Sequence, residues 1–224
     1  MDAAELQGEP TVAGEVYRDA ISTAREYASH LSTTGVEWGL IGPREVPRLW
    51  DRHILNCAVV ADLVDADDTV VDVGSGAGLP GIAMAIRRPD TAFTLVEPLA
   101  RRVQWLEMVV ADLGLHNVEV VRARSEELAG TRRFSVATAR AVAALSGLVP
   151  WTLPLLGPRG RLLAIKGQAA EEEIRKAGQA LRSFGASEKK IVTVGAGLLE
   201  VPTRVVEVIV GQNGGKVPGS LRKG

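Results

Sequence analysis

A glycine-rich segment is the part of the sequence whose residue types most directly predict chemistry. It reads DVGSGAGLPG over residues 72–81, after a short β-branched run and before a helical pattern. Glycine has no Cβ, so its backbone can turn tightly and approach a ligand closely. A glycine loop between a strand and a helix is typical of proteins that bind a nucleotide or a nucleoside.

The spacing within this loop distinguishes between ligands. Dinucleotide-binding loops carry G-x-G-x-x-G and hold a pyrophosphate at a helix N-terminus. Here Gly74, Gly76 and Gly78 form G-x-G-x-G, and Asp72 stands two positions before the first glycine. An acid there suits a cationic ligand or the loop's own amides better than a pyrophosphate. S-adenosylmethionine carries an ammonium and a sulfonium and no phosphate, so the loop favours it over NAD. The Walker pattern G-x-x-x-x-G-K-[ST] does not occur, which leaves a nucleoside triphosphatase with little support.

Glu97 ends the next β-rich run, 21 residues after Gly76. A carboxylate at the end of a second strand can accept hydrogen bonds from both hydroxyls of a ribose. Dehydrogenases use the same arrangement, so Glu97 supports a nucleoside ligand without choosing between the two cofactors. The alternative interpretation is a solvated acid at a strand end.

Two further segments follow predicted strand ends. Ser125 and Glu126 are suited to bind an adenine edge through amide and side-chain groups, or to begin a helix with Ser125 as its N-cap. Arg140 ends the fourth strand at the centre of the predicted crevice, where a charged group needs a partner. That partner is a carboxylate of the ligand or of Asp72, a substrate phosphate, or a member of a structural ion pair.

The elements that must position these residues alternate in type. Residues 1–66 have apolar residues at three- and four-residue intervals, which predicts helices over about 11–31 and 46–64. From residue 67 onward, β-rich runs alternate with helical stretches, which predicts parallel βαβ units with a ligand crevice at the carboxyl ends of the strands. Strands are expected at 69–73, 92–97, 118–122, 134–139, 160–166, 190–194 and 204–210, and helices at about 80–88, 99–113, 143–156 and 170–182. The chain thus divides into a helical extension (1–66), an α/β domain (67–210) and a flexible basic tail (211–224).

Composition and charge exclude several classes of protein. The single cysteine, Cys57, allows no intramolecular disulfide, which fits a reducing cytoplasm. The sequence shows no signal peptide, no membrane-spanning run and no zinc-ligand spacing, so neither a membrane nor a metal partner is expected. The net charge is −1, but residues 1–66 hold 11 acidic and 5 basic residues, whereas residues 67–224 hold 16 acidic and 21 basic residues. Unless this asymmetry is chance, a nucleic acid would meet the later part of the chain.

Together these segments resemble the GidB/RsmG family of ribosomal RNA methyltransferases. The resemblance rests on RHILN (52–56), the loop at 72–82, LVE (95–97), SEE (125–127), TARAV (138–142) and AIKG (164–167). It implies a Rossmann-like S-adenosylmethionine-dependent methyltransferase with a seven-stranded, mostly parallel sheet and an N-terminal helical extension. The implied reaction is methylation of N7 of a guanine in 16S ribosomal RNA, at the position equivalent to nucleotide 527 near the decoding region.

The site residues follow from the motifs and the resemblance together. Predicted cofactor-binding residues are Asp72, Gly74, Gly76, Gly78, Leu79, Glu97, Ser125, Glu126 and Arg140. Candidate RNA-binding residues are Arg48, Arg52, His53, Arg101, Arg102, Lys166 and Arg222, together with Lys216 and Lys223 near the C-terminus. For each arginine the alternative is a solvated surface position, and for His53 it is a satisfied histidine of the core.

Guanine N7 is a hydrogen-bond acceptor with a free lone pair, so it need not lose a proton before it accepts a methyl group. The enzyme's task is then to bring the two reactants close together and into line. We therefore expect no essential general base, and no catalytic residue is assigned. Because the chain is not strongly basic, we expect an assembled or assembling small ribosomal subunit, rather than free RNA, to be the partner.

Three other functions are consistent with some of the same sequence features. A methyltransferase that acts on another RNA, a protein or a small molecule would share the cofactor loop. An NAD-dependent oxidoreductase would share Glu97, but the loop spacing argues against it. A non-enzymatic RNA-binding or assembly factor would share the fold, but would not need the intact glycine loop.

Overall fold

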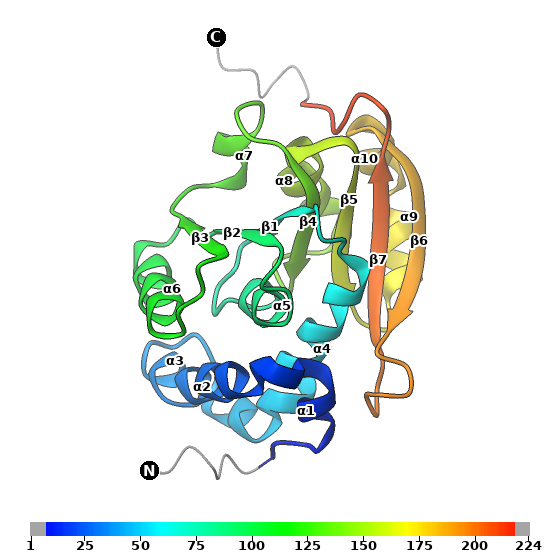
Figure 1. Cartoon of the computed structure of the whole chain (residues 1–224). Helices are drawn as coiled ribbons and strands as arrows, with labels where there is room; N and C mark the ends of the chain where they lie inside the picture. Colours follow the sequence, from blue (N-terminus) through cyan, green and yellow to red (C-terminus); the bar gives the residue numbers. More distant parts are fainter. Residues whose placement is uncertain (1–7, 218–224) are drawn as a thin grey trace.

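The computed structural model describes residues 8–217, and its centre is a seven-stranded sheet (Figure 1). The strand order is β3-β2-β1-β4-β5-β7-β6. The strands are β1 (Thr69–Val73), β2 (Ala92–Val96), β3 (Val118–Val121), β4 (Phe134–Arg140), β5 (Leu156–Lys166), β6 (Ala186–Val194) and β7 (Thr203–Val210). All the predicted strands are therefore confirmed, although β5 and β6 each begin four residues earlier than predicted.

The pairing of the strands places a crevice at the centre of the sheet. β1 pairs in parallel with β2 and with β4, and the β2–β3 and β4–β5 pairs are also parallel. β7 runs antiparallel between β5 and β6. β2 and β3 follow one another on one side of β1, and β4 lies on the other side of β1. The strand order therefore reverses between β1 and β4. A reversal of this kind opens a ligand crevice at the carboxyl ends of the strands. The predicted α/β, mostly parallel fold is confirmed.

The central strands are buried on both faces. In β1 and in β2, four of the five residues are buried, and the runs are rich in β-branched and apolar side chains. Such runs are typical of parallel strands that helices cover on both sides. Apolar residues of α5 and α6 share one core with the N-terminal helices, and those of α8 and α10 form a second core on the other face. The helices after β1 are α5 (Gly81–Arg87), α6 (Ala100–Asp112), α7 (Ser125–Leu128), α8 (Leu145–Thr152), α9 (Ala170–Lys176) and α10 (Gly178–Ser183), and a 3-10 turn, η6 (Leu153–Leu155), follows α8.

The N-terminal region packs on the α5 side of the sheet, below α5 and α6 in Figure 1. The Tyr17 hydroxyl donates to the carbonyl of Ala83 in α5 (3.3 Å), and the Tyr27 hydroxyl donates to the carbonyl of Ala77 in the glycine loop (2.7 Å). The predicted helical extension therefore shares the core of the α/β part and directly contacts the loop that sequence analysis singled out.

The helices of this region are shorter than predicted. A positive φ at Arg18 (+50°) divides the first into α1 (Val12–Tyr17) and α2 (Ile21–Ser32), which a 3-10 turn η2 (Arg18–Ala20) joins; α3 (Thr34–Glu37) follows. The single helix predicted over 46–64 is wrong. The chain instead winds through η3 (Pro43–Arg48), a π-helical turn η4 (Leu49–Ile54), α4 (Leu55–Ala58) and η5 (Val59–Leu63). Pro47 lies inside η3 and has no backbone N–H, so it cannot donate the hydrogen bond that would continue a helix begun before it.

The tail predicted to be flexible makes backbone hydrogen bonds to the α/β part of the chain as far as Lys216. The backbone N–H of Gly215 donates to Leu156 (3.0 Å), and that of Lys216 donates to Phe184 (3.0 Å). These backbone hydrogen bonds place Gly215 beside the start of β5 and Lys216 beside the residue that follows α10. The rest of the tail, with Arg222 and Lys223, lies outside the described residues. No helix within residues 8–217 is long and apolar enough to cross a membrane.

Candidate functional site

The glycine loop between β1 and α5 adopts a conformation that favours glycine. Gly74, Gly76 and Gly78 have φ values of +74°, +57° and +80°. Gly81, which begins α5, is packed so tightly that an added Cβ would lie 2.3 Å from Leu95 Cδ2 and 2.7 Å from Asp72 Oδ2. The loop therefore turns away from β1 and brings α5 directly against β2 and the Asp72 carboxylate.

Asp72 supports the loop from below. Its side chain is buried, Oδ2 accepts a hydrogen bond from the Gly81 backbone N–H (3.0 Å), and Oδ1 has no hydrogen-bond partner among residues 8–217. Burial raises the pKa of Asp72 to about 7, and the nearby Glu97 acts in the same direction. Ser75 secures the same turn, because its hydroxyl donates to the backbone carbonyl of Asp72 (3.0 Å).

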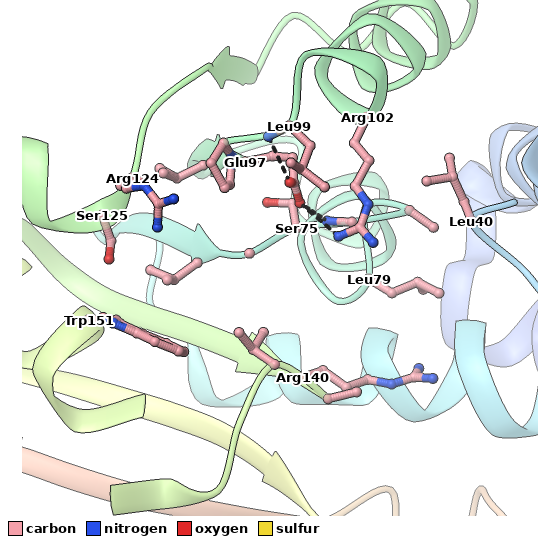
Figure 2. Close-up of a pocket in the computed structure, with 18 of the residues that line it drawn as sticks. Leu40, Ser75, Leu79, Glu97, Leu99, Arg102, Arg124, Ser125, Arg140 and Trp151 are labelled. Carbon is pink, nitrogen blue, oxygen red and sulfur yellow. Dashed lines mark hydrogen bonds and ion pairs between the residues drawn. The ribbon is translucent and has the colours of Figure 1, made fainter. Parts of the chain in front are cut away.

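Glu97, at the end of β2, is held in a fixed orientation beside the loop. The side chain is buried, with Oε2 accepting from the Gly76 N–H (3.1 Å) and Oε1 from the Leu99 N–H (3.1 Å). The guanidinium of Arg102 lies 3.6 Å from Oε2, and Figure 2 shows Glu97 between Leu99 and Arg102. A carboxylate has further lone pairs, so these contacts leave capacity to accept hydrogen bonds from a ligand.

A cavity of about 590 Å³ opens beyond the carboxyl ends of β1, β2 and β4. This volume lies within the range of small-molecule and cofactor sites, roughly 300–1,000 Å³. The predicted cofactor residues that line it are Gly74, Gly76, Leu79, Glu97, Ser125, Glu126 and Arg140. Asp72 and Gly78 are buried instead and do not line the cavity.

The apolar walls of this cavity were not predicted from the sequence. They come from segments far apart in the chain, namely Leu40, Ile41, Leu99, Val142 and Trp151. Arg124 also lines the cavity, and Figure 2 shows it beside Ser125. Leu99 lies two residues after Glu97, and Val142 lies two residues after Arg140. Both could therefore have been predicted from their positions just beyond strand ends. Trp151 in α8 and the Leu40–Ile41 pair carried no such signal.

Ser125 and Glu126 lie at the first turn of α7, at one end of the cavity. Ser125 is buried, and its hydroxyl donates to Glu126 Oε2 (3.2 Å). Arg124, rather than Ser125, occupies the N-cap position of the helix, and no side chain caps it. The first amides of α7 are therefore not satisfied by a cap and lie where a ligand edge could accept from them.

Arg140 connects the end of β4 to the N-terminal region. Its Nη1 donates to the carbonyl of His53 (3.2 Å) and to Cys57 Sγ (3.1 Å), and its Nη2 contacts His53 Nδ1. On the other side of the ring, His53 Nε2 lies 2.8 Å from Glu45 Oε2. Burial lowers the pKa of His53, and Arg140 acts in the same direction while Glu45 opposes it. The hydrogen-bond partners of Arg140 are therefore in the N-terminal region, and Asp72 is not among them.

The candidate RNA-binding residues fall in three different settings. Arg48 and Arg52 are exposed on the N-terminal region, and Arg101 is exposed with its guanidinium 5.7 Å from the centre of the Trp38 ring. Arg102 and His53 line the cavity. Lys166 is largely buried, because its ammonium binds Glu173 (2.8 Å) and the carbonyl of Ala143 (2.7 Å). Within residues 8–217, no three His, Cys, Asp or Glu side chains are grouped so that they could hold a metal ion.

Solved structures of other proteins share the fold of this chain. The structure of M. jannaschii TYW2 in complex with AdoMet matches with a TM-score of 0.56 at 15% identity over 73% of this chain and 78% of that one. A SAM-dependent O-methyltransferase from Thermotoga maritima matches with a TM-score of 0.54 at 12% identity over 75% of this chain and 70% of that one. At these identities the likeness shows the fold alone, which is that of Rossmann-like methyltransferases.

Sequence relatives define the family within this class. The family model for GidB, described as rRNA small subunit methyltransferase G, matches residues 20–201. A protein of Pseudarthrobacter chlorophenolicus named ribosomal RNA small subunit methyltransferase G is 53% identical over 93% of this chain and 94% of that protein. A protein of the same name from Streptomyces avermitilis is 51% identical over 99% of this chain and 92% of that protein. The chain therefore belongs to the GidB family, and the resemblance drawn from its motifs is confirmed.

Proposed function

We propose that this protein transfers the methyl group of S-adenosylmethionine to N7 of a guanine in 16S ribosomal RNA, at the position equivalent to nucleotide 527, in the cytoplasm. The observation that carries the proposal is the buried Glu97 carboxylate beside the glycine loop, where the strand order of the sheet reverses. The chain that holds this carboxylate belongs to the GidB family. Family membership also removes the support for an NAD-dependent oxidoreductase.

The residues that line the cavity fit the proposed cofactor. Glu97 has free acceptor capacity for ribose hydroxyls, the first turn of α7 presents Ser125 and Glu126 to an adenine edge, and the wall formed by Leu99 and Trp151 suits the faces of a purine. Gly74 and Gly76 allow a ligand to approach the loop backbone closely. When bound, S-adenosylmethionine supplies an electrophilic methyl group carried on a sulfonium.

The residues of the cavity then act by orientation rather than by proton transfer. Because guanine N7 already carries a lone pair, no side chain has to remove a proton before attack. Glu97 is fixed by two backbone amides, so a nucleoside held by it would have a defined position relative to the cavity mouth. Holding two reactants in a reactive arrangement can supply several kcal/mol, about 7–11 in well-oriented model reactions.

Cationic side chains at the cavity suit a phosphate backbone. Arg102 and Arg124 line the cavity and are exposed, and Arg101 is the residue before Arg102 on α6. Arginines placed in this way can contact the phosphates that flank a target nucleotide. The exposed acidic residues Glu37 and Asp51 lie on the same N-terminal region as Arg48 and Arg52, so binding of free RNA by that surface would be weak. An assembled small subunit could supply the missing contacts.

The experiment is methyl transfer to defined substrates. The protein is incubated with labelled S-adenosylmethionine and either small ribosomal subunits or naked 16S RNA from a strain that lacks it. We expect label in the RNA of the subunits, recovered as 7-methylguanosine, and much less label in the naked RNA. If S-adenosylmethionine binds but neither RNA is labelled, 16S RNA is not the substrate. Equal labelling of both RNAs would contradict the role of the assembled subunit.

A further inference from the structure

The turn between β4 and α8, residues 141–144, forms one wall of the cavity. Ala141 and Val142 line the cavity, and an added Cβ on Gly74 would lie 3.0 Å from Val142 Cγ2, so Val142 packs over the glycine loop. Ala141 has a φ of +56°, a conformation that is unfavourable for a residue with a Cβ. Contacts from the surrounding structure must therefore hold the turn in this conformation.

The strand order indicates which part of the cofactor this turn would face. In the proposed function, the first turn of α7, which follows β3, takes the adenine, and Glu97, at the end of β2, takes the ribose. The sheet continues from β2 to β1 and then to β4. The end of the cavity at β4 is thus left for the methyl group and the guanine that receives it.

A largely buried ion pair contacts the turn from the side of β5 and α9. Lys166 ends β5, its side chain is 9% exposed, and its ammonium lies 2.8 Å from Glu173 Oε2 in α9. The ammonium also donates to the carbonyl of Ala143 (2.7 Å). Oε2 of Glu173 accepts from the backbone N–H of Leu145 (2.7 Å), the first residue of α8. The pair thus binds the turn at its third residue and at the residue that follows it.

The turn is held from the opposite side as well. Arg140, the residue before it, donates to the carbonyl of His53 (3.2 Å). Burial acts to raise the pKa of Glu173, but the hydrogen bonds from Lys166 and from the Leu145 N–H outweigh burial, so this pKa lies below its ordinary value. Glu173 is therefore ionised at neutral pH, and both of its hydrogen bonds are charge-assisted.

We infer that Lys166 and Glu173 are positioning residues for methyl transfer, because they hold the turn at 141–144 against the site where the guanine would meet the methyl group. This role rests on the proposed function and differs from the RNA contact expected of Lys166 from the sequence. If the ammonium left for a phosphate, the Glu173 carboxylate would lose its cationic partner in a largely buried setting. Reaction rates depend steeply on alignment, so a small displacement of the turn would slow transfer without removing a group that binds either reactant.

The test compares substitutions of this pair with a substitution of a second ion pair of α9. Glu173→Gln keeps the length of the side chain and an acceptor for the Leu145 N–H, but loses the charge that binds Lys166. Lys166→Met removes the ammonium and keeps an apolar stem. Glu171→Gln is the matched control, because Glu171 pairs with Arg204 of β7 instead. For the single variants and the double variant of the pair, kcat and KM for small subunits are measured together with the Kd for S-adenosylmethionine and the Tm.

We expect kcat to fall about tenfold in Glu173→Gln and in Lys166→Met, with KM for the subunit and the Kd for S-adenosylmethionine each changing less than about threefold. The double variant should lose no more activity than the weaker of the two single variants, because both residues act through one turn. The Glu171→Gln protein should match the wild type in kcat.

Wild-type kcat in both single variants of the pair would overturn the inference. An increase in KM in Lys166→Met with kcat retained would also overturn it, because the ammonium would then serve as an RNA contact. The same holds if cofactor affinity falls as much as kcat, or if Glu171→Gln loses as much kcat as Glu173→Gln, which would indicate a general loss of stability. Absence of transfer by the wild-type protein would instead count against the proposed function itself.

Discussion

The guanidinium of Arg140 contacts Nδ1 of His53, and this contact fixes the protonation of the ring. A guanidinium can only donate hydrogen bonds, so Nδ1 must accept and carries no proton. The proton of the neutral imidazole is then on Nε2, where it is donated to Glu45 Oε2 at 2.8 Å. Glu45, His53 and Arg140 thus form one chain of hydrogen bonds from the N-terminal region to the end of β4. This chain holds the turn that carries Val142.

Acid should weaken this chain. The fold lowers the pKa of His53 below its ordinary value of 6.5, because burial and Arg140 disfavour the imidazolium more than Glu45 favours it. Between the lowered pKa and 6.5, the unfolded chain binds a proton that the folded chain does not, so stability falls as the pH falls through that window.

His53→Asn keeps an acceptor for Arg140 and has no titrating ring, so the stability lost between pH 7 and pH 5 should be smaller in the variant than in the wild type. Urea denaturation at a series of pH values measures this difference. His116→Asn serves as the control, because His116 does not line the cavity. An unchanged pH dependence in His53→Asn would show that the ring titrates alike in the folded and unfolded chains.

Loss of the Glu97 carboxylate should weaken cofactor binding. Glu97→Ala removes the acceptor of two backbone amides and the partner of Arg102, and it removes the acceptor expected for the ribose. Hydrogen bonds to a charged group contribute roughly 1.5–3 kcal/mol, so affinity for S-adenosylmethionine should fall about 10- to 100-fold. Titration calorimetry provides the measurement. Glu119→Ala removes a carboxylate outside this cavity and should bind as the wild type does.

Substitution of Gly81 should destabilise the whole protein. In Gly81→Ala the new Cβ would meet Leu95 and Asp72 at 2.3 and 2.7 Å, and overpacking of this kind costs about 1–3 kcal/mol. Gly14→Ala is the matched control, because Gly14 lies in α1 with nothing within 4 Å of an added Cβ. It should instead gain roughly 0.5–1 kcal/mol. Chemical denaturation distinguishes the two variants, and equal stabilities would contradict the packing described for α5.

Lys166 and Arg102 should differ in their contribution to RNA binding. Arg102 is exposed at the cavity, so Arg102→Ala should reduce the slope of log K against log salt for subunit binding by about 1. Lys166 is bound to Glu173 and to the carbonyl of Ala143. Lys166→Ala should therefore leave the salt slope unchanged and lower the Tm. A reduced slope in Lys166→Ala would show that its ammonium leaves Glu173 to meet a phosphate.

The parts of the site that are local in sequence could be predicted. Gly74, Gly76 and Glu97 lie next to strand ends, and the strands themselves have a recognisable residue pattern, so the sequence contains both the element and its position. Asp72 was also identified, but its role beneath the loop depends on the approach of Gly81, which a linear pattern does not show. The antiparallel insertion of β7 between β5 and β6 likewise follows from pairing between distant segments.

The N-terminal contribution could not be predicted for a related reason. Leu40 and Ile41 reach the cavity because the whole helical region packs against α5, and the residues between the helices carry no periodicity. Arg140 was recognised as a charged group that needs a partner, but the partner is 87 residues earlier in the chain. Because such a long-range contact depends on how the helices pack, the pattern of a single sequence does not identify the hydrogen-bond partner of Arg140.

The most direct test of the account maps methylation within 16S RNA from three strains: one that lacks the protein, and two in which wild-type protein or Glu97→Ala is restored. Mass spectrometry is applied to the RNA fragment that holds the position equivalent to nucleotide 527. We expect 7-methylguanosine in this fragment only when the wild-type protein is present, with unmodified guanosine in the other two strains. The same 7-methylguanosine content in the strain that lacks the protein, or a methyl group on a different atom, would contradict it.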